Sequence, residues 1–104
     1  MTVRPPSRFS AASLQESLQS ALDYEVAAEK ATSLGHAGRV VAQRLERLRA
    51  FQGDKAGRVP LIKDAADAVW AYFIQRELCG LRRHDDAIRE YAIPREVLVR
   101  LGAR

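Results

Sequence analysis

Few side chains in this sequence could do chemistry, and they are far apart along the chain. Glu25 and Glu29 lie one helical turn apart, a spacing that suits carboxylate metal ligands on a helix. Di-iron sites in helical bundles also need a Glu three residues before a His, and neither His36 nor His84 has one. We therefore predict no di-metal centre and expect His36 to be a surface side chain.

Cys79, His84 and Asp85 form the second combination that could do chemistry. One cysteine and one histidine fall short of the four ligands of a closed zinc site. As nucleophile and base, they would need an orienting third group and oxyanion donors, for which no motif is present. Gly35-His-Ala-Gly38 lacks the Lys-Ser or Lys-Thr of a phosphate-binding loop. We expect a small buried thiol at Cys79, and no metal or cofactor.

Arg76 and Glu77 lie at the edge of an apolar helix face and could form a buried polar cluster with Tyr24. A small enzyme would need such a cluster, and we rank an enzyme third among the candidate functions. In the simpler interpretation both residues lie in the last turn of their helix, reach solvent and pair with Glu29 or Lys30. We favour the simpler interpretation and expect no enzyme.

The formal net charge of +4 is concentrated in one basic block, because residues 38–58 carry 6 basic and 2 acidic side chains. A solvated helix face is one interpretation, and a nucleic-acid interface is the other. The candidate contact residues are Arg39, Arg44, Arg47 and Arg49. A helix-turn-helix made from residues 85–101 is disfavoured, because its second helix has few side chains left to read a groove.

These residues must be positioned by helices, and the organising segment is Tyr24–Phe51. One hydrophobic phase holds there for 4 heptads, the pattern of a helix with a narrow apolar seam. The seam consists of Tyr24, Ala27, Ala31, Leu34, Gly38, Val41, Leu45 and Leu48. Gly35 and Gly38 would suit a turn between two helices, but a turn has no reason to preserve phase. We favour one helix over residues 12–51, begun after Ser10 or Ser13, over a helical hairpin.

A polar loop, Gln52–Pro60, precedes a second helix predicted for Leu61–Cys79, with Pro60 at its entry. If this helix returns antiparallel along the first, the numbers of facing residues sum to about 111. Trp70 and Phe73 would then cover a thin flank of the first helix. That flank consists of Gly35, Gly38 and Ala42.

The chain after Gly80 predicts two short helices, one beginning at His84 and ending near Tyr91, the other from Pro94 at its first position to Gly102. We expect them to cover residues 14–26, which the second helix is too short to reach. The predicted fold class is therefore all-α, a helical bundle with one long N-terminal helix, an antiparallel second helix and two short C-terminal helices. Residues 1–10, with paired prolines, are predicted to be a mobile N-terminal arm, and residues 11–104 a single helical domain.

Several stretches together resemble a small family of bacterial helical proteins of unknown function, of about this length. They are Asp23-Tyr-Glu25, Glu29-Lys-Ala31, Leu34-Gly-His-Ala-Gly38, Ala68-Val-Trp70, Gln75-Arg-Glu77, Cys79-Gly-Leu81 and Ile93-Pro-Arg-Glu-Val97. The resemblance implies a helical, cytoplasmic bacterial protein and implies no activity, substrate or site.

No apolar run approaches the roughly 20 residues that span a bilayer, and the start has no signal-peptide core. We expect a cytoplasmic protein without membrane contact. A 40-residue helix is about 60 Å long and has too little cover of its own, which favours a homodimer. We expect a non-enzymatic, homo-oligomeric interaction or regulatory module, with a possible further protein partner and with nucleic-acid binding as the alternative.

Overall fold

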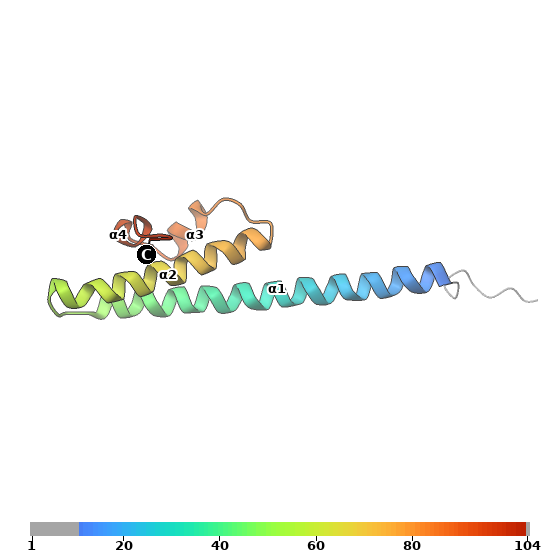
Figure 1. Ribbon diagram of the computed structural model, residues 1–104, viewed down its shortest axis with the longest axis horizontal. Helices are drawn as coiled ribbons and strands as arrows, with labels where there is room; N and C mark the ends of the chain where they lie inside the picture. Colours follow the sequence, from blue (N-terminus) through green and yellow to red (C-terminus); the bar gives the residue numbers. More distant parts are fainter. Residues whose placement is uncertain (1–10, 104) are drawn as a thin grey trace, which may run out of the picture.

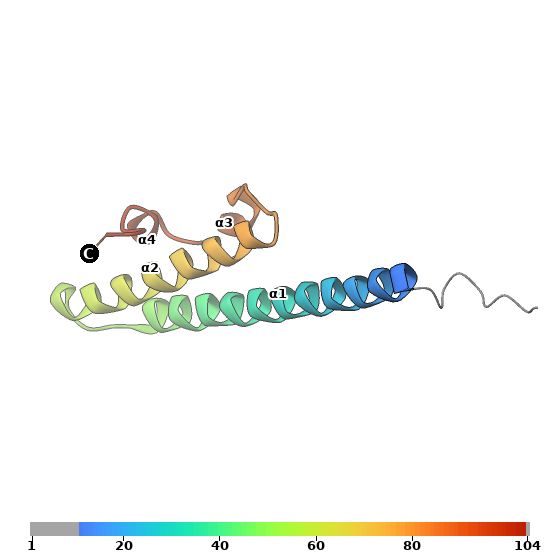
Figure 2. The same cartoon turned by 45° about the vertical axis from the view of Figure 1, so that its right-hand side comes forward.

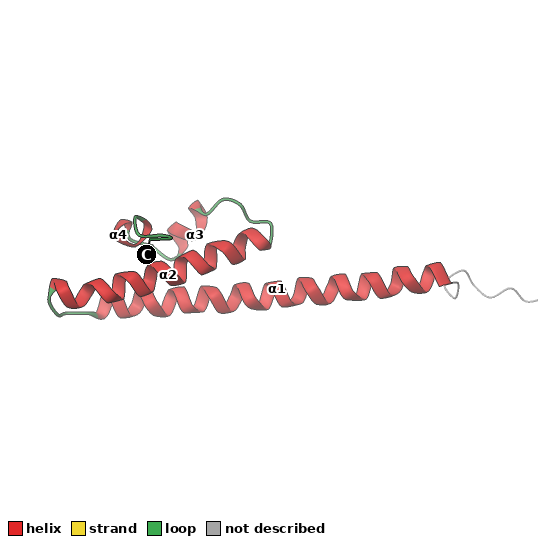
Figure 3. Ribbon diagram, viewed as in Figure 1, coloured by secondary structure: helices red, strands yellow, loops and turns green. Residues whose placement is uncertain are grey.

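The protein is all-α in the computed structural model, which describes residues 11–103 (Figures 1 and 3). Its elements are α1 (Ala11–Ala50), α2 (Lys55–Leu78), α3 (Asp85–Glu90) and α4 (Arg95–Leu98). The predicted fold class, with one long helix, a second helix and two short ones, is confirmed. The predicted mobile arm, residues 1–10, lies outside the described residues.

The long helix α1 is continuous through both glycines, so the helical hairpin is excluded. Ser13 lies inside α1 and is not its cap, while Ser10 lies outside the described residues. The four buried residues of α1 all belong to the predicted seam and lie in its second half: Gly38, Val41, Leu45 and Leu48. The unbroken heptad pattern therefore predicted the helix correctly, although each glycine costs roughly 1 kcal/mol in a helix interior.

The turn between α1 and α2 is shorter than predicted. The loop is residues 51–54, and α2 begins at Lys55 because the side chain of Asp54 caps it by accepting a bond from the backbone N–H of Gly57 at 2.9 Å. Pro60 consequently lies inside α2. It has no N–H to donate to the carbonyl of Ala56, but Ala56 is exposed. The prediction of a loop to Pro60 was wrong because Asp54, which lies inside the predicted loop, caps the N-terminus of α2.

The register of the antiparallel pair is close to the predicted sum of 111. A Cβ at Gly38 would contact Tyr72 at 3.4 Å, and the thiol of Cys79 donates to the carbonyl of Lys30 at 3.7 Å. These pairs sum to 110 and 109 (38 + 72 and 30 + 79). The relative height of the two helices therefore follows from loop length and helix rise.

The rotation of α2 differs from the prediction. Phe73 is buried as expected, but Trp70 is 48% exposed, and Tyr72 occupies the place opposite Gly38. Trp70 is about 100° around the helix from the fully buried Val69, which turns its ring away from α1. Gly38 does receive large rings, those of Tyr72 and Tyr91. Gly35 and Ala42 are exposed and take no part in this packing.

The C-terminal segment lies along α2 and runs back towards the N-terminal end of α2 (Figures 1 and 2), and at Tyr91 it also contacts Gly38 and Arg49 of α1. The prediction that it covers residues 14–26 was wrong, since Ala87, Ile93 and Val97 bury themselves in the same core as α2. Pro94 caps α4 from outside rather than taking its first position, and α4 ends at Leu98. The first half of α1 extends beyond α2, and no other helix formed by residues 11–103 lies beside it.

Two arginines attach this segment to the rest of the fold. Nη2 of Arg49 donates to the carbonyls of Tyr91 and Ala92 at 2.8 and 3.1 Å. Arg58 forms a two-bond ion pair with Glu96, which lowers the pKa of the Glu96 carboxyl and raises that of the guanidinium. Burial, followed by the neighbouring Tyr72, raises the pKa of Tyr91.

None of the helices within residues 11–103 has the length and apolar character needed to cross a membrane.

Candidate functional site

Arg76 is the centre of a polar cluster at the C-terminal end of α2. It is only 7% exposed, and its guanidinium is fixed by three bonds. Nε donates to Nδ1 of His84 at 3.1 Å, while Nη2 donates to the carbonyl of Arg83 at 2.9 Å and to Asp86 at 3.1 Å. The expectation that Arg76 reaches solvent and pairs with α1 was wrong, because the chain after Gly80 folds back over it.

His84 joins this cluster to Glu77 and to the core. Its ring stacks on Phe73, with centroids 4.1 Å apart and planes 3° from parallel, and its Nε2 lies 3.0 Å from Oε2 of Glu77. Because Nε of Arg76 can only donate, Nδ1 of His84 accepts, and the proton of the neutral ring lies on Nε2, facing Glu77. Both ring nitrogens are thus occupied by partners, so the cluster holds the segment before α3 against α2.

Tyr24 is not part of this cluster. Its side chain is 77% exposed on the first half of α1, six residues before Lys30, the residue of α1 that Cys79 of α2 reaches. At 1.5 Å per residue, six residues separate Tyr24 from that level by about 9 Å along the axis. The structure therefore brings together two of the three residues proposed for a polar site, Arg76 and Glu77, and adds His84. Within residues 11–103 no three His, Cys, Asp or Glu side chains lie close enough to hold a metal.

The four arginines of the predicted basic face do not share one side of α1. Arg44 and Arg49 are five residues apart, about 140° around the helix, so they flank the buried seam on opposite sides. Arg49 holds the C-terminal segment, and Arg44 donates to Gln43 at 3.0 Å. Arg39 and Arg47 are exposed. Nucleic-acid binding remains a prediction, with a smaller set of available contacts.

The first half of α1 carries an exposed apolar row, here called the leucine stripe and defined as Leu14, Leu18, Leu22 and Val26. These side chains are between 49% and 64% exposed. At about 100° per residue, Leu14, Leu18 and Leu22 are about 140–180° around α1 from Leu45, and Val26 is about 100° from it, so most of the leucine stripe lies on the side of α1 opposite to the buried seam. No part of the described C-terminal segment reaches it, since every residue from 14 to 33 is exposed.

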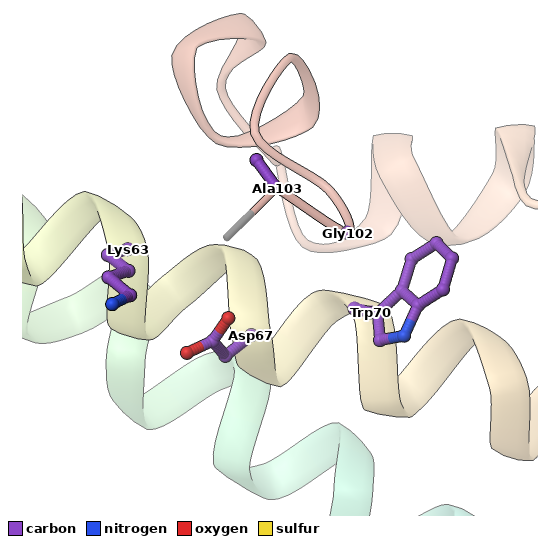
Figure 4. Close-up of a pocket in the computed structure, with 5 residues that line it drawn as sticks. All are labelled: Lys63, Asp67, Trp70, Gly102 and Ala103. Atoms are coloured by element: carbon purple, nitrogen blue, oxygen red, sulfur yellow. The ribbon is translucent and has the colours of Figure 1, made fainter.

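An open hollow of about 520 Å³ lies between α2 and the last described residues (Figure 4). Its lining includes Lys63, Asp67 and the ring of Trp70, all from one side of α2. Gly102 has a positive φ of 72°, and a Cβ there would lie 3.4 Å from the indole ring. The exposed Trp70 is therefore a packing surface for the end of the chain.

The whole of the described structure lies within a match to the model of a family of unknown function, DUF6665, which covers residues 8–104. The chain belongs to DUF6665. The predicted membership of a family of unknown function is thus confirmed. Among curated proteins and among solved structures, nothing matches the chain.

In this DUF6665 member, two site features were not predicted from the sequence. A short helix was predicted to begin at His84, yet α3 begins after it with no side-chain cap bond, and the ring of His84 bonds Arg76 and Glu77 instead. A signal for this was present, because Gly80 ends α2 four residues before His84 and so returns the chain towards the last turn. The role of Tyr91 opposite Gly38 had no comparable local signal.

Proposed function

We propose that the protein is a non-enzymatic helical interaction module that associates with a second copy of itself through the leucine stripe. The observation that supports this is the row of four half-exposed apolar side chains on a part of α1 that no other element among residues 11–103 covers. A side chain exposed singly needs no explanation, whereas four in a row on an uncovered helix are typical of an interface.

The charges beside the leucine stripe favour an antiparallel arrangement of the two copies. Glu25 and Glu29 are 7 and 11 residues from Leu18, about two and three turns, and therefore lie on the same side of α1 as the stripe. A parallel, in-register pair would place each of these carboxylates opposite its own copy. An antiparallel pair centred on Ser20 instead places Leu18 opposite Leu22 and keeps the acidic residues apart.

This geometry also leaves room for the rest of both molecules. In the antiparallel pair the helical cores lie at opposite ends, because residues after Leu34 of one copy extend beyond Ala11 of the other. Most of the stripe faces away from α2 of its own chain, so no described element would obstruct the second α1 there. The expected complex is a two-fold dimer, the commonest symmetry among homo-oligomers.

The affinity expected from this surface is modest. Burying the exposed half of each stripe residue is worth about 1 kcal/mol, or roughly 8 kcal/mol for the eight side chains of a dimer. Association itself costs about 4 kcal/mol or more. The difference of about 4 kcal/mol corresponds to a Kd of about 1 mM, so we expect a dimer whose population depends on concentration.

The test is molar mass by sedimentation equilibrium across a wide concentration range, on three versions of the full chain. Leu18→Glu should weaken the dimer at least 30-fold, because two leucines are lost at about 1 kcal/mol each. Ala27→Glu is the matched control, since it introduces the same charge nine residues away, 2.5 turns around the same uncovered helix.

Two outcomes would contradict the proposal. One is a wild-type chain that stays monomeric up to millimolar concentration. The other is a dimer that Ala27→Glu dissociates while Leu18→Glu leaves it intact, which would assign the interface to the continuation of the buried seam.

A further inference from the structure

A hollow of about 510 Å³ lies at the C-terminal end of α2, where the chain turns towards α3. Four arginines line it, together with two aspartates, so the hollow carries an excess of two positive charges (4 basic, 2 acidic). The lining arginines are Arg76, Arg82, Arg83 and Arg89. Its volume falls within the range of about 300–1,000 Å³ that is usual for small-molecule sites.

One of these arginines is built into the fold. Arg76 is buried, and its bonds to His84, the carbonyl of Arg83 and Asp86 fix the plane of the guanidinium. Those bonds use Nε and Nη2, and Nη1 makes none among the described residues. A guanidinium fixed in this way is pre-organised to donate from its remaining nitrogen.

The other three arginines have exposed side chains that form no ion pair with any residue in the described part of the chain. Of the two acidic neighbours, Asp86 is already engaged by Arg76 and by the backbone N–H of Ala87. Three unpaired guanidinium groups around one hollow repel one another, and an anion among them would relieve that repulsion. Phosphate oxygens suit arginine best, because the planar fork binds two of them at once.

We infer that this hollow binds a small phosphate-bearing anion, such as a pyrophosphate group, between the exposed arginines and the fixed Arg76. The site lies at the end of α2, on residues that take no part in the leucine stripe, so it does not depend on the proposed dimer. The exposed arginines supply attraction, and the buried Arg76 supplies a fixed donor. Because the mouth is open to solvent, the affinity should be moderate and should fall as salt rises.

Isothermal titration of the full chain with pyrophosphate, at constant ionic strength, tests this inference. We expect saturable binding of one pyrophosphate per chain, and no heat beyond dilution from potassium chloride at matched ionic strength. The double variant Arg82→Gln/Arg89→Gln should bind at least tenfold more weakly. Circular dichroism should show unchanged helix content, since neither side chain forms an ion pair within the described part of the fold.

The matched control is Arg39→Gln/Arg47→Gln, which removes the same charge from exposed positions of α1. It should retain wild-type binding. An equal loss in both double variants would show a general charge effect and would overturn the site, as would the absence of saturable heat. A short DNA duplex that binds more tightly than pyrophosphate and loses affinity in both double variants would assign the arginines to a nucleic-acid surface instead.

Discussion

The two glycines inside α1 should respond in opposite ways to a single added methyl group. A Cβ at Gly35 would have only Nη1 of the exposed Arg39 near it, at 3.4 Å. A Cβ at Gly38 would lie 2.6 Å from the hydroxyl oxygen of Tyr91 and 3.4 Å from Tyr72. Alanine is favoured over glycine in a helix interior by about 1 kcal/mol, so the difference between the sites must come from packing.

For Gly35→Ala the full helical gain should appear, because the end of a flexible arginine moves aside easily. We expect the free energy of unfolding to rise by about 1 kcal/mol. For Gly38→Ala the Tyr91 hydroxyl has to retreat by about 1 Å to reach an ordinary contact distance. Its ring packs edge-on against Tyr72 at 5.5 Å, and its own carbonyl is held by Arg49. Overpacking of this kind costs about 1–3 kcal/mol, which leaves a net loss of about 1 kcal/mol.

Urea unfolding followed by circular dichroism would measure both changes, and the midpoints should move in opposite directions. The matched background is Tyr91→Phe, which removes the oxygen and leaves ring carbon Cζ at 3.7 Å, an ordinary contact. In that background Gly38→Ala should stabilise the protein. The reasoning is refuted if Gly38→Ala stabilises the wild-type chain as much as Gly35→Ala does, or if Tyr91→Phe fails to change its sign.

Two further predictions concern the C-terminal segment. Ala92 has a φ of 50°, a backbone conformation that costs a residue with a Cβ about 1–2 kcal/mol. Ala92→Gly removes this cost but makes the unfolded chain more flexible, so we expect the free energy of unfolding to rise by only about 0.5 kcal/mol. An unchanged or lower urea midpoint would contradict this. Glu96→Gln should lower the thermal midpoint at pH 7, whereas Glu46→Gln, an exposed change on α1, should leave it nearly unchanged. Arg58 holds the pKa of Glu96 below its ordinary 4.5, so the stabilisation is present above that value and is lost as the pH falls through the lowered pKa. The difference between wild type and Glu96→Gln should therefore fade in acid, and a constant difference down to strongly acidic pH would count against the ion pair.

The height of α2 along α1 could be predicted from the sequence, whereas its rotation could not. Loop length and helix rise fix which residues lie at the same level, and the pairs Gly38–Tyr72 and Lys30–Cys79 agree with that calculation. Rotation depends on which part of an apolar band faces which neighbour. The band of α2 is wide because it packs on α1 and also under the C-terminal segment. Trp70 and Val69 are adjacent in that band, and the pattern alone does not assign Trp70 to the C-terminal side.

The Arg76 cluster shows a second limit of prediction from sequence. Arg76 and Glu77 could be recognised as polar residues at the edge of an apolar face, but their partners come from a loop whose direction depends on Gly80. A positive φ at this glycine, 87°, turns the chain back so that His84 meets Phe73. The glycine predicts a turn, but the sequence does not predict the direction in which the chain continues. Because the chain folds back, Arg76 is buried and makes three bonds to the segment after Gly80.

The exposed N-terminal half of α1 depends for its stability on the C-terminal half, which packs in the core. In isolation a helix is costly to nucleate, and in proteins most of its stability comes from tertiary packing. Here the buried residues from Gly38 to Leu48 supply the nucleus, and residues 11–33 extend it with local support such as the Gln19–Asp23 bond at 2.9 Å. Order along this half should therefore decline from Leu34 towards Ala11, the direction in which distance from the core increases. The leucine stripe lies in that least supported part, so docking of a second copy would both bury the stripe and stabilise the helix that presents it.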